Sequence, residues 1–365
     1  MKTSDFDYEL PEELIAQTPL EPRDSSYLMV IDKNNKTFKH QHFYDILDYL
    51  QAGDVLVWNN SKVFKARLHG WVELDEKTAG VKLPLKSTDK ILNSAKVEIF
   101  LVRPMENFGV WKVLAKPGKK LRLGMKVVFA GDFSAEVIAR EMDGTFLMQF
   151  NDNDVEVRAK ANKYGEVPLP PYIKTEKFLG LESRYQTVYA KTEGSVAAPT
   201  AGFHFTPELI EKLKNKGVEF AEITLHVGLG TFLPVKTADI EEHKMHSEWV
   251  ELSDKNAHTI NNAKIEGRRV IAVGTTTVRT LEGIAQGLEG NVVCPWQGDI
   301  NIFVSPGFKF KIIDALITNF HLPKSTLLML VSAFVGSREF TLECYEEAVK
   351  ENYRFFSFGD AMLIK

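Results

Sequence analysis

The chain has 365 residues, of which 44% are hydrophobic and 26% are charged, a composition typical of folded proteins. A single hydrophobic core rarely grows beyond about 250–300 residues, so we expect two domains. Cys294 and Cys344 are far apart and neither belongs to a CxxC pair, which argues against a disulfide framework and a thiolate zinc site.

The N-terminal ten residues include Lys2, Asp5, Asp7 and Glu9, a charge pattern that does not fit a signal peptide. The most apolar run, Leu327–Val335, is far shorter than the roughly 20 residues of a membrane-spanning helix. We therefore expect a soluble, cytoplasmic protein without membrane contact.

The net charge of −4 is distributed unevenly along the chain. Residues 60–126 contain 15 Lys and Arg against 6 Asp and Glu, a balance of +9, whereas the rest of the chain has a balance of −13. A basic segment on an acidic protein favours a polyanionic partner, although a solvated charged surface is the simpler alternative.

The first predicted elements are short buried strands at Tyr27–Ile31 and Val55–Trp58, with a helical stretch at Phe43–Leu50 between them. From about residue 66 to residue 150 the pattern changes to short alternating or apolar runs, separated by Gly and Asp. Regular short strands of this kind predict a small antiparallel barrel. Its six runs are Ala66–Leu74, Lys96–Val102, Val110–Leu114, Lys126–Phe129, Ala135–Ala139 and Thr145–Phe150.

After about Asn151, strands again alternate with helices. Thr206 and Pro207 begin a helix that stops at Gly217 and is followed by a strand at Val218–Val227. Alternation of this kind indicates crossover connections and a largely parallel sheet. Two further segments fit it: a helix from Ser253 to near Gly267, and a strand at Arg269–Val273 that leads through Gly274–Thr277 into a helix at Val278–Gln286.

We therefore predict a mixed, largely parallel α/β domain with an inserted antiparallel β-barrel domain. The α/β domain is expected to comprise residues 1–65 and 157–365, and the barrel residues 66–156. Ligands of such sheets bind beyond the carboxyl ends of the strands.

Two motifs resemble a dinucleotide-binding site and a metal site, but their residue patterns argue against both. Gly228 and Gly230 follow a predicted strand, but Leu233 stands where a dinucleotide fingerprint has its third glycine. His243 and His246 lack an HExxH context, which favours a surface or capping role over a metal site.

The segment Thr318–Thr326 gathers an amide, an imidazole, an ammonium and hydroxyl groups in a turn before an apolar run, as in a preorganised site. A capped helix start is the alternative for this segment. Gly and Thr or Ser surround one reactive side chain in three other stretches: Gly194–Phe205, Val273–Glu282 and Phe356–Leu363.

Together these segments identify the sequence as similar, from end to end except in the barrel region, to the S-adenosylmethionine:tRNA ribosyltransferase-isomerase family of queuosine biosynthesis. The pair Ala197–Gly202 and Asn319–Ser325 is the most specific part of the resemblance. The other matching segments are Asp7–Gln17, Arg23–Asp24, Ala66–Leu68, Pro168–Ile173, Arg184–Ala190, His226–Phe232, His243–Glu248, Gly274–Glu282, Thr318–Val335 and Tyr353–Ile364.

The sequence also departs from the family pattern at several positions. The family usually has Arg in place of Tyr27, Thr-Arg in place of Ser61-Lys62, and Pro in place of Lys65. It usually has Arg in place of Leu233 and Thr in place of Ile300. Residues 79–94 resemble an additional loop in the barrel region. These departures affect the expected substrate contacts rather than the family assignment.

The resemblance implies an α/β domain that holds S-adenosylmethionine and uses it as a ribosyl donor. The implied acceptor is 7-aminomethyl-7-deazaguanine at the wobble position of tRNA, and the products are epoxyqueuosine, adenine and methionine. No cofactor beyond S-adenosylmethionine as co-substrate is implied, and we expect a monomer. An S-adenosylmethionine-dependent RNA methyltransferase and a noncatalytic RNA-binding protein are the alternatives.

Such a reaction requires proton transfer, for which a histidine or carboxylate with a shifted pKa is suited. We rank His321 first, because it lies between Asn319 and Lys324, whose donors are expected either to hold an anion or to fix its ring. His204 is second because it follows Gly202, which lets the backbone approach a ligand closely, and Asp360 is the candidate carboxylate partner.

We expect the segment Thr275, Thr276 and Thr277 to receive the methionine carboxylate at a helix N-terminus, with Arg279 as charged partner and Glu282 as the ion-pair mate of Arg279. The other predicted substrate-binding residues are His226, Asn319, Lys324, Ser325, Phe203 and Phe320, of which the phenylalanines are candidates for stacking on a base. Phosphate contacts of the tRNA are predicted at Lys116, Lys119, Lys120, Arg122 and Lys126.

Overall fold

A computed structural model describes residues 1–73, 95–170, 172–174, 180, 182–228, 237–243, 245 and 247–365. The chain forms two compact units. The larger unit comprises Met1–Lys62 and Pro170–Lys365, and the smaller unit comprises Val63–Leu169.

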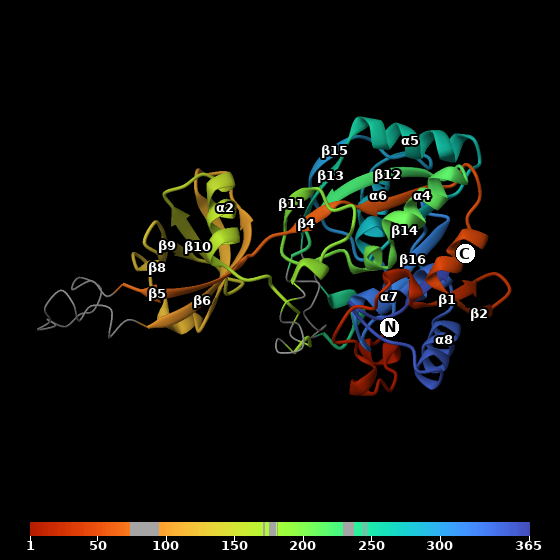
Figure 1. The fold of residues 1–365 in the computed structure, drawn as a ribbon, viewed down its shortest axis with the longest axis horizontal. Helices are drawn as coiled ribbons and strands as arrows, with labels where there is room; N and C mark the ends of the chain where they lie inside the picture. Colours follow the sequence, from red (N-terminus) through yellow and green to blue (C-terminus); the bar gives the residue numbers. More distant parts are fainter. Residues whose placement is uncertain are drawn as a thin grey trace, which may run out of the picture. The chain divides into compact units, whose positions relative to one another are not determined.

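The larger unit contains a nine-stranded mixed sheet, in the order β15-β13-β12-β3-β14-β16-β17-β1-β2 (Figure 1). Its centre, β12-β3-β14-β16, is parallel, and the outer pairs β1–β2, β12–β13, β13–β15 and β16–β17 are antiparallel. The strands are β1 (Tyr27–Asp32), β2 (Thr37–His42), β3 (Val55–Asn59), β12 (Glu219–Leu225), β13 (Glu248–Leu252), β14 (Val270–Val273), β15 (Trp296–Ile300), β16 (Ala315–Asn319) and β17 (Ala361–Ile364).

Hydrophobic side chains project from both faces of this sheet, because successive side chains of a strand point to opposite faces. In β1, Leu28 and Val30 pack into the core on one face, while Met29 and Ile31 pack into the core on the other. The first core includes the 3-10 helix η4 (Phe43–Asp48) and α4 (Pro207–Asn215). The second includes α5 (Asp254–Ile265), α6 (Thr275–Gln286), α7 (Thr326–Val335) and α8 (Arg338–Lys350).

The helix boundaries agree with the predicted capping signals at several points. The hydroxyl of Thr206 accepts a hydrogen bond from the Leu209 amide at 3.1 Å, and Ser253 caps α5 in the same way. Two boundaries differ from the prediction. The stretch after Phe43 is a 3-10 helix that ends at Asp48, and α6 begins at Thr275 rather than Val278.

The smaller unit is a closed six-stranded antiparallel barrel in the order β10-β7-β6-β5-β8-β9, which confirms the predicted fold class. Each of the six predicted runs overlaps one of these strands, and four of the strands extend beyond the predicted ends. Val97, Ile99 and Leu101 of β6 fill the core at alternate positions. The strands are β5 (Arg67–Val72), β6 (Lys96–Pro104), β7 (Val110–Lys116), β8 (Lys126–Ala130), β9 (Phe133–Arg140) and β10 (Phe146–Phe150); α2 (Asp154–Tyr164) follows them. The remaining strands within the described residues are β4 (Ser61–Val63) and β11 (Thr192–Ser195), which pair with each other.

Candidate active site

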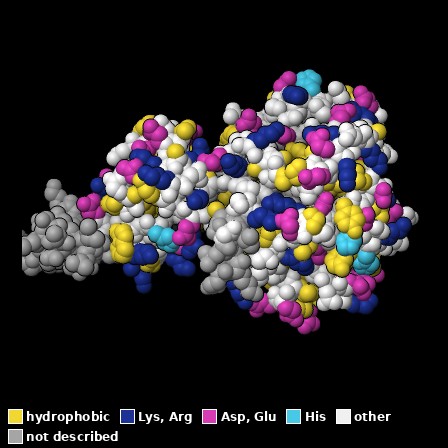
Figure 2. Space-filling model, in the orientation of Figure 1, with side chains coloured by type: hydrophobic (Ala, Val, Ile, Leu, Met, Phe, Trp, Pro, Cys, Tyr) yellow, Lys and Arg dark blue, Asp and Glu magenta, His cyan; other side chains and the backbone are white. Residues whose placement is uncertain are grey.

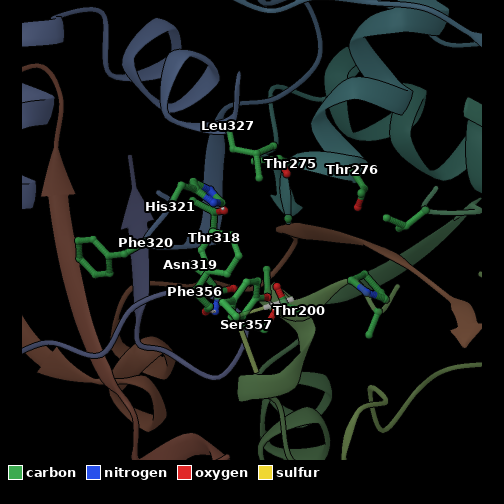
Figure 3. Close-up of a pocket in the computed structure, with 16 residues that line it drawn as sticks. Thr200, Thr275, Thr276, Thr318, Asn319, Phe320, His321, Leu327, Phe356 and Ser357 are labelled. Atoms are coloured by element: carbon green, nitrogen blue, oxygen red, sulfur yellow. Dashed lines mark hydrogen bonds between the residues drawn. The ribbon is translucent and has the colours of Figure 1, made fainter. Parts of the chain in front are cut away.

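A pocket lies at the carboxyl ends of the neighbouring parallel strands β14 and β16, where this sheet type is expected to bind ligands. It contains about 590 Å³ of empty space, part of which is open to solvent. Figure 3 shows residues of its lining, which combine hydroxyl, amide and imidazole groups with aromatic and aliphatic side chains. Its lining comprises Tyr172, Ala198, Pro199, Thr200, Ala201, Val227, Gly274, Thr275, Thr276, Thr318, Asn319, Phe320, His321, Leu327, Phe356 and Ser357.

The N-terminus of α6 forms one wall of the pocket. Gly274 is the N-cap residue, with a positive φ of 88° that disfavours other residues, and as a glycine it provides no side-chain cap. The Thr276 hydroxyl is buried and has no hydrogen-bond partner among the described residues. Thr277 does not line the pocket: it is fully buried, and its hydroxyl donates to the Val273 carbonyl at 2.8 Å. Thr275 and Thr276 are therefore the part of the predicted anion site that faces the pocket.

The end of β16 and the turn after it form the opposite wall, with His321 at its centre (Figure 3). The His321 Nε2 atom lies 3.0 Å from the Thr318 hydroxyl oxygen. Its main-chain amide donates to the Tyr345 hydroxyl at 3.2 Å, and its carbonyl accepts from Tyr8 at 2.5 Å. Burial lowers the pKa of His321 to about 3, so the ring is neutral at physiological pH.

The predicted supports of the His321 ring are not the observed ones. The side-chain amide of Asn319 donates to the Phe356 carbonyl at 3.0 Å, and Lys324 forms an ion pair with Asp7 at 2.7 Å. The side chain that contacts the His321 ring is that of Thr318, in the role expected of Asn319 and Lys324. Lys324 is about half exposed and does not line the pocket.

His204 lines a second, smaller pocket, of about 260 Å³, which shares Ser357 with the first. Its Nδ1 atom lies 2.7 Å from the Ser26 hydroxyl, and its ring stacks on Phe43. The Nε2 atom faces the side chain of Asn319 without a hydrogen bond of ordinary geometry. Burial lowers the pKa of His204 to about 3, and the Arg354 and Arg23 guanidinium groups add to the effect. A Cβ at Gly202 would meet the Tyr189 hydroxyl, so the close approach that the structure shows at this glycine is to Tyr189.

Asp360 is fully buried and lines neither pocket. Its carboxylate accepts the main-chain amide hydrogens of Tyr27 at 2.9 Å and Arg354 at 2.7 Å. Burial raises its pKa to about 6, and these two hydrogen bonds oppose the shift. In this geometry Asp360 joins the loop that carries Phe356 and Ser357 to the first residue of β1.

The predicted pairing of Arg279 with Glu282 is wrong. The Arg279 guanidinium is buried and forms an ion pair with Glu248 of β13, while its Nε donates to the Ile302 carbonyl at 3.3 Å. The Glu282 carboxylate accepts three main-chain amide hydrogens from the consecutive residues 311–313. Neither side chain lines the pocket, because tertiary partners hold both in the interior.

The other predicted substrate-binding residues have mainly structural contacts. His226 stacks on Trp249 with ring centroids 5.2 Å apart, and Ser325 caps α7 by accepting the Leu328 amide hydrogen. Phe203 is nearly buried beside Phe358 in the smaller pocket. Phe320 contributes to the main pocket, but its ring packs edge-on or tilted against three core aromatics, Tyr345, Tyr353 and Phe355.

The five predicted phosphate-binding side chains are all exposed on the barrel unit. Among these five side chains, Lys126 forms an ion pair with Glu73 at 3.5 Å, so its charge is partly balanced by an acidic neighbour. The other four, Lys116, Lys119, Lys120 and Arg122, lie at the end of β7 and in the turns before β8.

Four of the five departures from the family pattern fall on described residues. Tyr27 is 45% exposed and stacks on His42. Lys62 and Lys65 are exposed, whereas Ile300 is buried in β15. Leu233 and residues 79–94 lie outside the described residues.

Sequence reasoning did not single out several residues of the pocket. Tyr172, Thr200, Phe356 and Ser357 each belong to a segment that resembles the family, but no residue pattern assigned them to a site. The hydroxyls of Tyr172 and Ser357 are hydrogen-bonded to each other. Only the folded chain brings these two residues, 185 positions apart, into one wall.

Both cysteines are free thiols, as expected. Within the described ranges, no group of three or more His, Cys, Asp or Glu side chains is arranged to hold a metal ion. The same ranges contain no helix long and apolar enough to cross a membrane.

Comparison with known proteins gives one consistent family. A model of the queuosine biosynthesis protein family matches residues 3–364. The S-adenosylmethionine:tRNA ribosyltransferase-isomerases of Thermotoga petrophila and Carboxydothermus hydrogenoformans are 51% and 53% identical to this chain, with 100% of both chains covered in each case. The crystal structure of S-adenosylmethionine tRNA ribosyltransferase from Thermotoga maritima has a TM-score of 0.55 and 41% identity, covering 99% of this chain and 100% of that one.

Proposed function

Because this chain belongs to the queuosine biosynthesis protein family, we propose that it transfers and isomerises the ribosyl moiety of S-adenosylmethionine onto 7-aminomethyl-7-deazaguanine at the tRNA wobble position. The products are epoxyqueuosine-tRNA, adenine and methionine. The observation that carries this proposal is the full-length match to ribosyltransferase-isomerases at 51–53% identity, together with a pocket built from the most specific matching segments.

The main pocket has the chemistry that such a donor requires. Among the described residues, its lining includes no acidic or basic side chain other than the neutral His321, so hydroxyl and amide groups supply the polar contacts there. The uncapped N-terminus of α6 attracts negative charge, which suits the carboxylate of the methionine portion. The unpartnered Thr276 hydroxyl lies beside this helix start and is available to the same carboxylate.

His321 is the proton-transfer group that the pocket presents most directly. A neutral imidazole both accepts a proton and donates a hydrogen bond, and the hydroxyl of Thr318 restrains its orientation. His204 acts from behind this wall, because its ring faces Asn319, which lines the pocket. Asp360 positions the loop of Phe356 and Ser357 rather than reaching the pocket itself.

The exposed cations of the barrel are proposed to contact the phosphates of the same tRNA. Lys119, Lys120 and Arg122 lie within one short turn region of the smaller unit, and each side chain is exposed. Interactions with phosphates contribute affinity without reading a base sequence. Recognition of the modified base then falls to the larger unit.

The deciding experiment measures the products formed from S-adenosylmethionine and tRNA that carries the aminomethyl-deazaguanine. The proposal requires release of adenine and methionine only when this tRNA is present. Formation of S-adenosylhomocysteine would instead identify an RNA methyltransferase. Binding of tRNA without any product would identify a noncatalytic RNA-binding protein. Release of adenine regardless of the tRNA base would contradict the proposed acceptor.

A further inference from the structure

An unassigned column of aromatic rings lies at the edge of the sheet formed by β1 and β2. Starting from the buried Tyr353, it continues through Tyr27 and His42 to Tyr44, with ring centroids 5.3, 5.0 and 5.1 Å apart. Tyr27 and Tyr44 are each 45% exposed. Figure 2 shows hydrophobic and histidine side chains gathered on this part of the larger unit.

The column is held rigidly by main-chain contacts. The Nδ1 of His42 lies 3.0 Å from the Ser25 carbonyl, and because a carbonyl only accepts, Nδ1 carries the hydrogen. The main-chain amide of His42 donates to Asp45, which fixes the start of η4 and hence the position of Tyr44. A fixed ring loses little conformational freedom when a second ring stacks on it.

One end of the column is open. Tyr27 has ring neighbours in both His42 and Tyr353, whereas within the described residues Tyr44 has a ring contact with His42 alone. The two rings of the last pair are inclined by only 16°. A flat aromatic ligand therefore extends the column by stacking on the outer face of Tyr44.

The column lies at the same end of the sheet as the pocket. The strand register places Asn319 opposite Ala361, Ala361 opposite Leu28, and Leu28 opposite Gln41. Three strand spacings of about 4.8 Å separate the first of these residues from the last by about 14 Å. The segment from Tyr353 to Ser357 also connects the inner end of the column directly to the pocket wall.

We propose that Tyr44 is a stacking platform for an unpaired base of the tRNA, flanking the base that enters the pocket. This inference rests on the proposed function, which supplies the RNA. Unstacked bases of RNA loops are commonly bound on aromatic side chains, and the contact tolerates any base because every base has a π-face.

The charges around the column favour stacking over phosphate contact. The Asp45 carboxylate is bound to the His42 amide, and Glu347 pairs with His40 at 3.9 Å and with Lys350 at 3.1 Å. The column therefore has two carboxylates, Asp45 and Glu347, as well as Lys350 near it. Its contribution to tRNA affinity should consequently depend little on salt, unlike that of the barrel cations.

The test compares Tyr44→Ala, Tyr44→Phe and Tyr44→Trp in the full-length protein. The matched control is Trp296→Ala, because Trp296 is 39% exposed on β15, at the opposite edge of the same sheet. Affinity for the modified tRNA is measured at several salt concentrations, and adenine release and S-adenosylmethionine binding are measured in parallel.

Tyr44→Ala should weaken tRNA binding by about 5- to 150-fold, the range contributed by base–aromatic stacking. The salt slope and S-adenosylmethionine binding should stay unchanged, and the Phe, Trp and control variants should retain wild-type affinity. A Tyr44→Ala affinity within twofold of wild type, or an equal loss in Tyr44→Phe, would overturn the platform. If the wild-type protein releases adenine with tRNA in that case, the proposed function survives, whereas wild-type protein that binds no tRNA refutes both.

Discussion

The imidazole Nε2 of His321 lies 3.0 Å from the hydroxyl of Thr318, three residues earlier, at the point where β16 enters the pocket. Both residues line the pocket, and burial keeps the ring neutral. The hydroxyl therefore restrains the orientation of the His321 ring, which makes the pair a direct test of the proposed proton transfer.

We expect His321→Ala to lower kcat for adenine release by about 10²–10⁴-fold at saturating substrates, the usual contribution of a general acid or base. Thr318→Val should cause a smaller loss, because the ring remains but its restraint is removed. Binding of both substrates and thermal unfolding serve as controls. A loss below tenfold in His321→Ala, with fold and affinities intact, would remove His321 from the catalytic residues.

The pKa values of the buried histidines predict loss of stability in mild acid. His204 and His321 have folded pKa values of about 3, below the ordinary value of 6.5, so between these limits only the unfolded chain binds the protons. The free energy of unfolding should therefore fall as pH falls from 6.5, by up to about 1.4 kcal/mol per pH unit for each histidine. Asp360, with a folded pKa of about 6 against an ordinary 3.8, should act in the opposite direction between pH 6 and 3.8.

Urea unfolding at pH 7, 6 and 5 checks this balance. His321→Gln should show a shallower decline of stability with falling pH than the wild type, and Asp360→Asn a steeper one. Identical pH dependence in all three proteins would show that these groups do not titrate as their burial predicts.

The contacts of Arg279 change the expected effect of its substitution from binding to stability. Arg279→Ala leaves the buried Glu248 carboxylate without its guanidinium partner, which commonly costs about 3–5 kcal/mol. The KM for S-adenosylmethionine should hardly change in protein that remains folded. Thr276→Val should show the reverse pattern, a raised KM with little loss of stability, because Thr276 lines the pocket and its hydroxyl has no partner to lose. Chemical unfolding and KM measurements on both variants distinguish the two roles.

Arg279 also shows where sequence reasoning reaches its limit. Spacing along a helix predicted Glu282 as its partner, since residues three apart are neighbours on a helix. The observed partner, Glu248, comes from a different strand, and tertiary proximity of this kind leaves no pattern in a single sequence. Tyr172 and Ser357 illustrate the same limit within the pocket.

Sequence patterns predict the structure better where the stabilising contacts lie close together along the chain. The barrel was predictable because its strands alternate and glycine or aspartate separates them. The start of α6 was placed three residues late because Gly274 has no side chain to act as a visible cap. The four residues of β17 are uniformly apolar and too short for any period to show. Asn319, His321, Thr275 and Thr276 were found because they belong to specific motifs at strand ends.

The last prediction concerns the exposed cations of the barrel. Changing Lys119, Lys120 and Arg122 together to Glu should weaken tRNA binding strongly at low salt, because each reversal replaces phosphate attraction by repulsion. Single changes to Ala should lower the salt slope of log affinity by about 1 for each lost contact. Since these side chains are exposed, folding and S-adenosylmethionine binding should not change. The matched control is charge reversal of three exposed lysines on the larger unit, Lys212, Lys255 and Lys309, which should affect tRNA binding far less. An equal effect of both triple variants would mean that net charge alone attracts the RNA, and an unchanged tRNA affinity in the barrel variant would make its basic surface a solvated one.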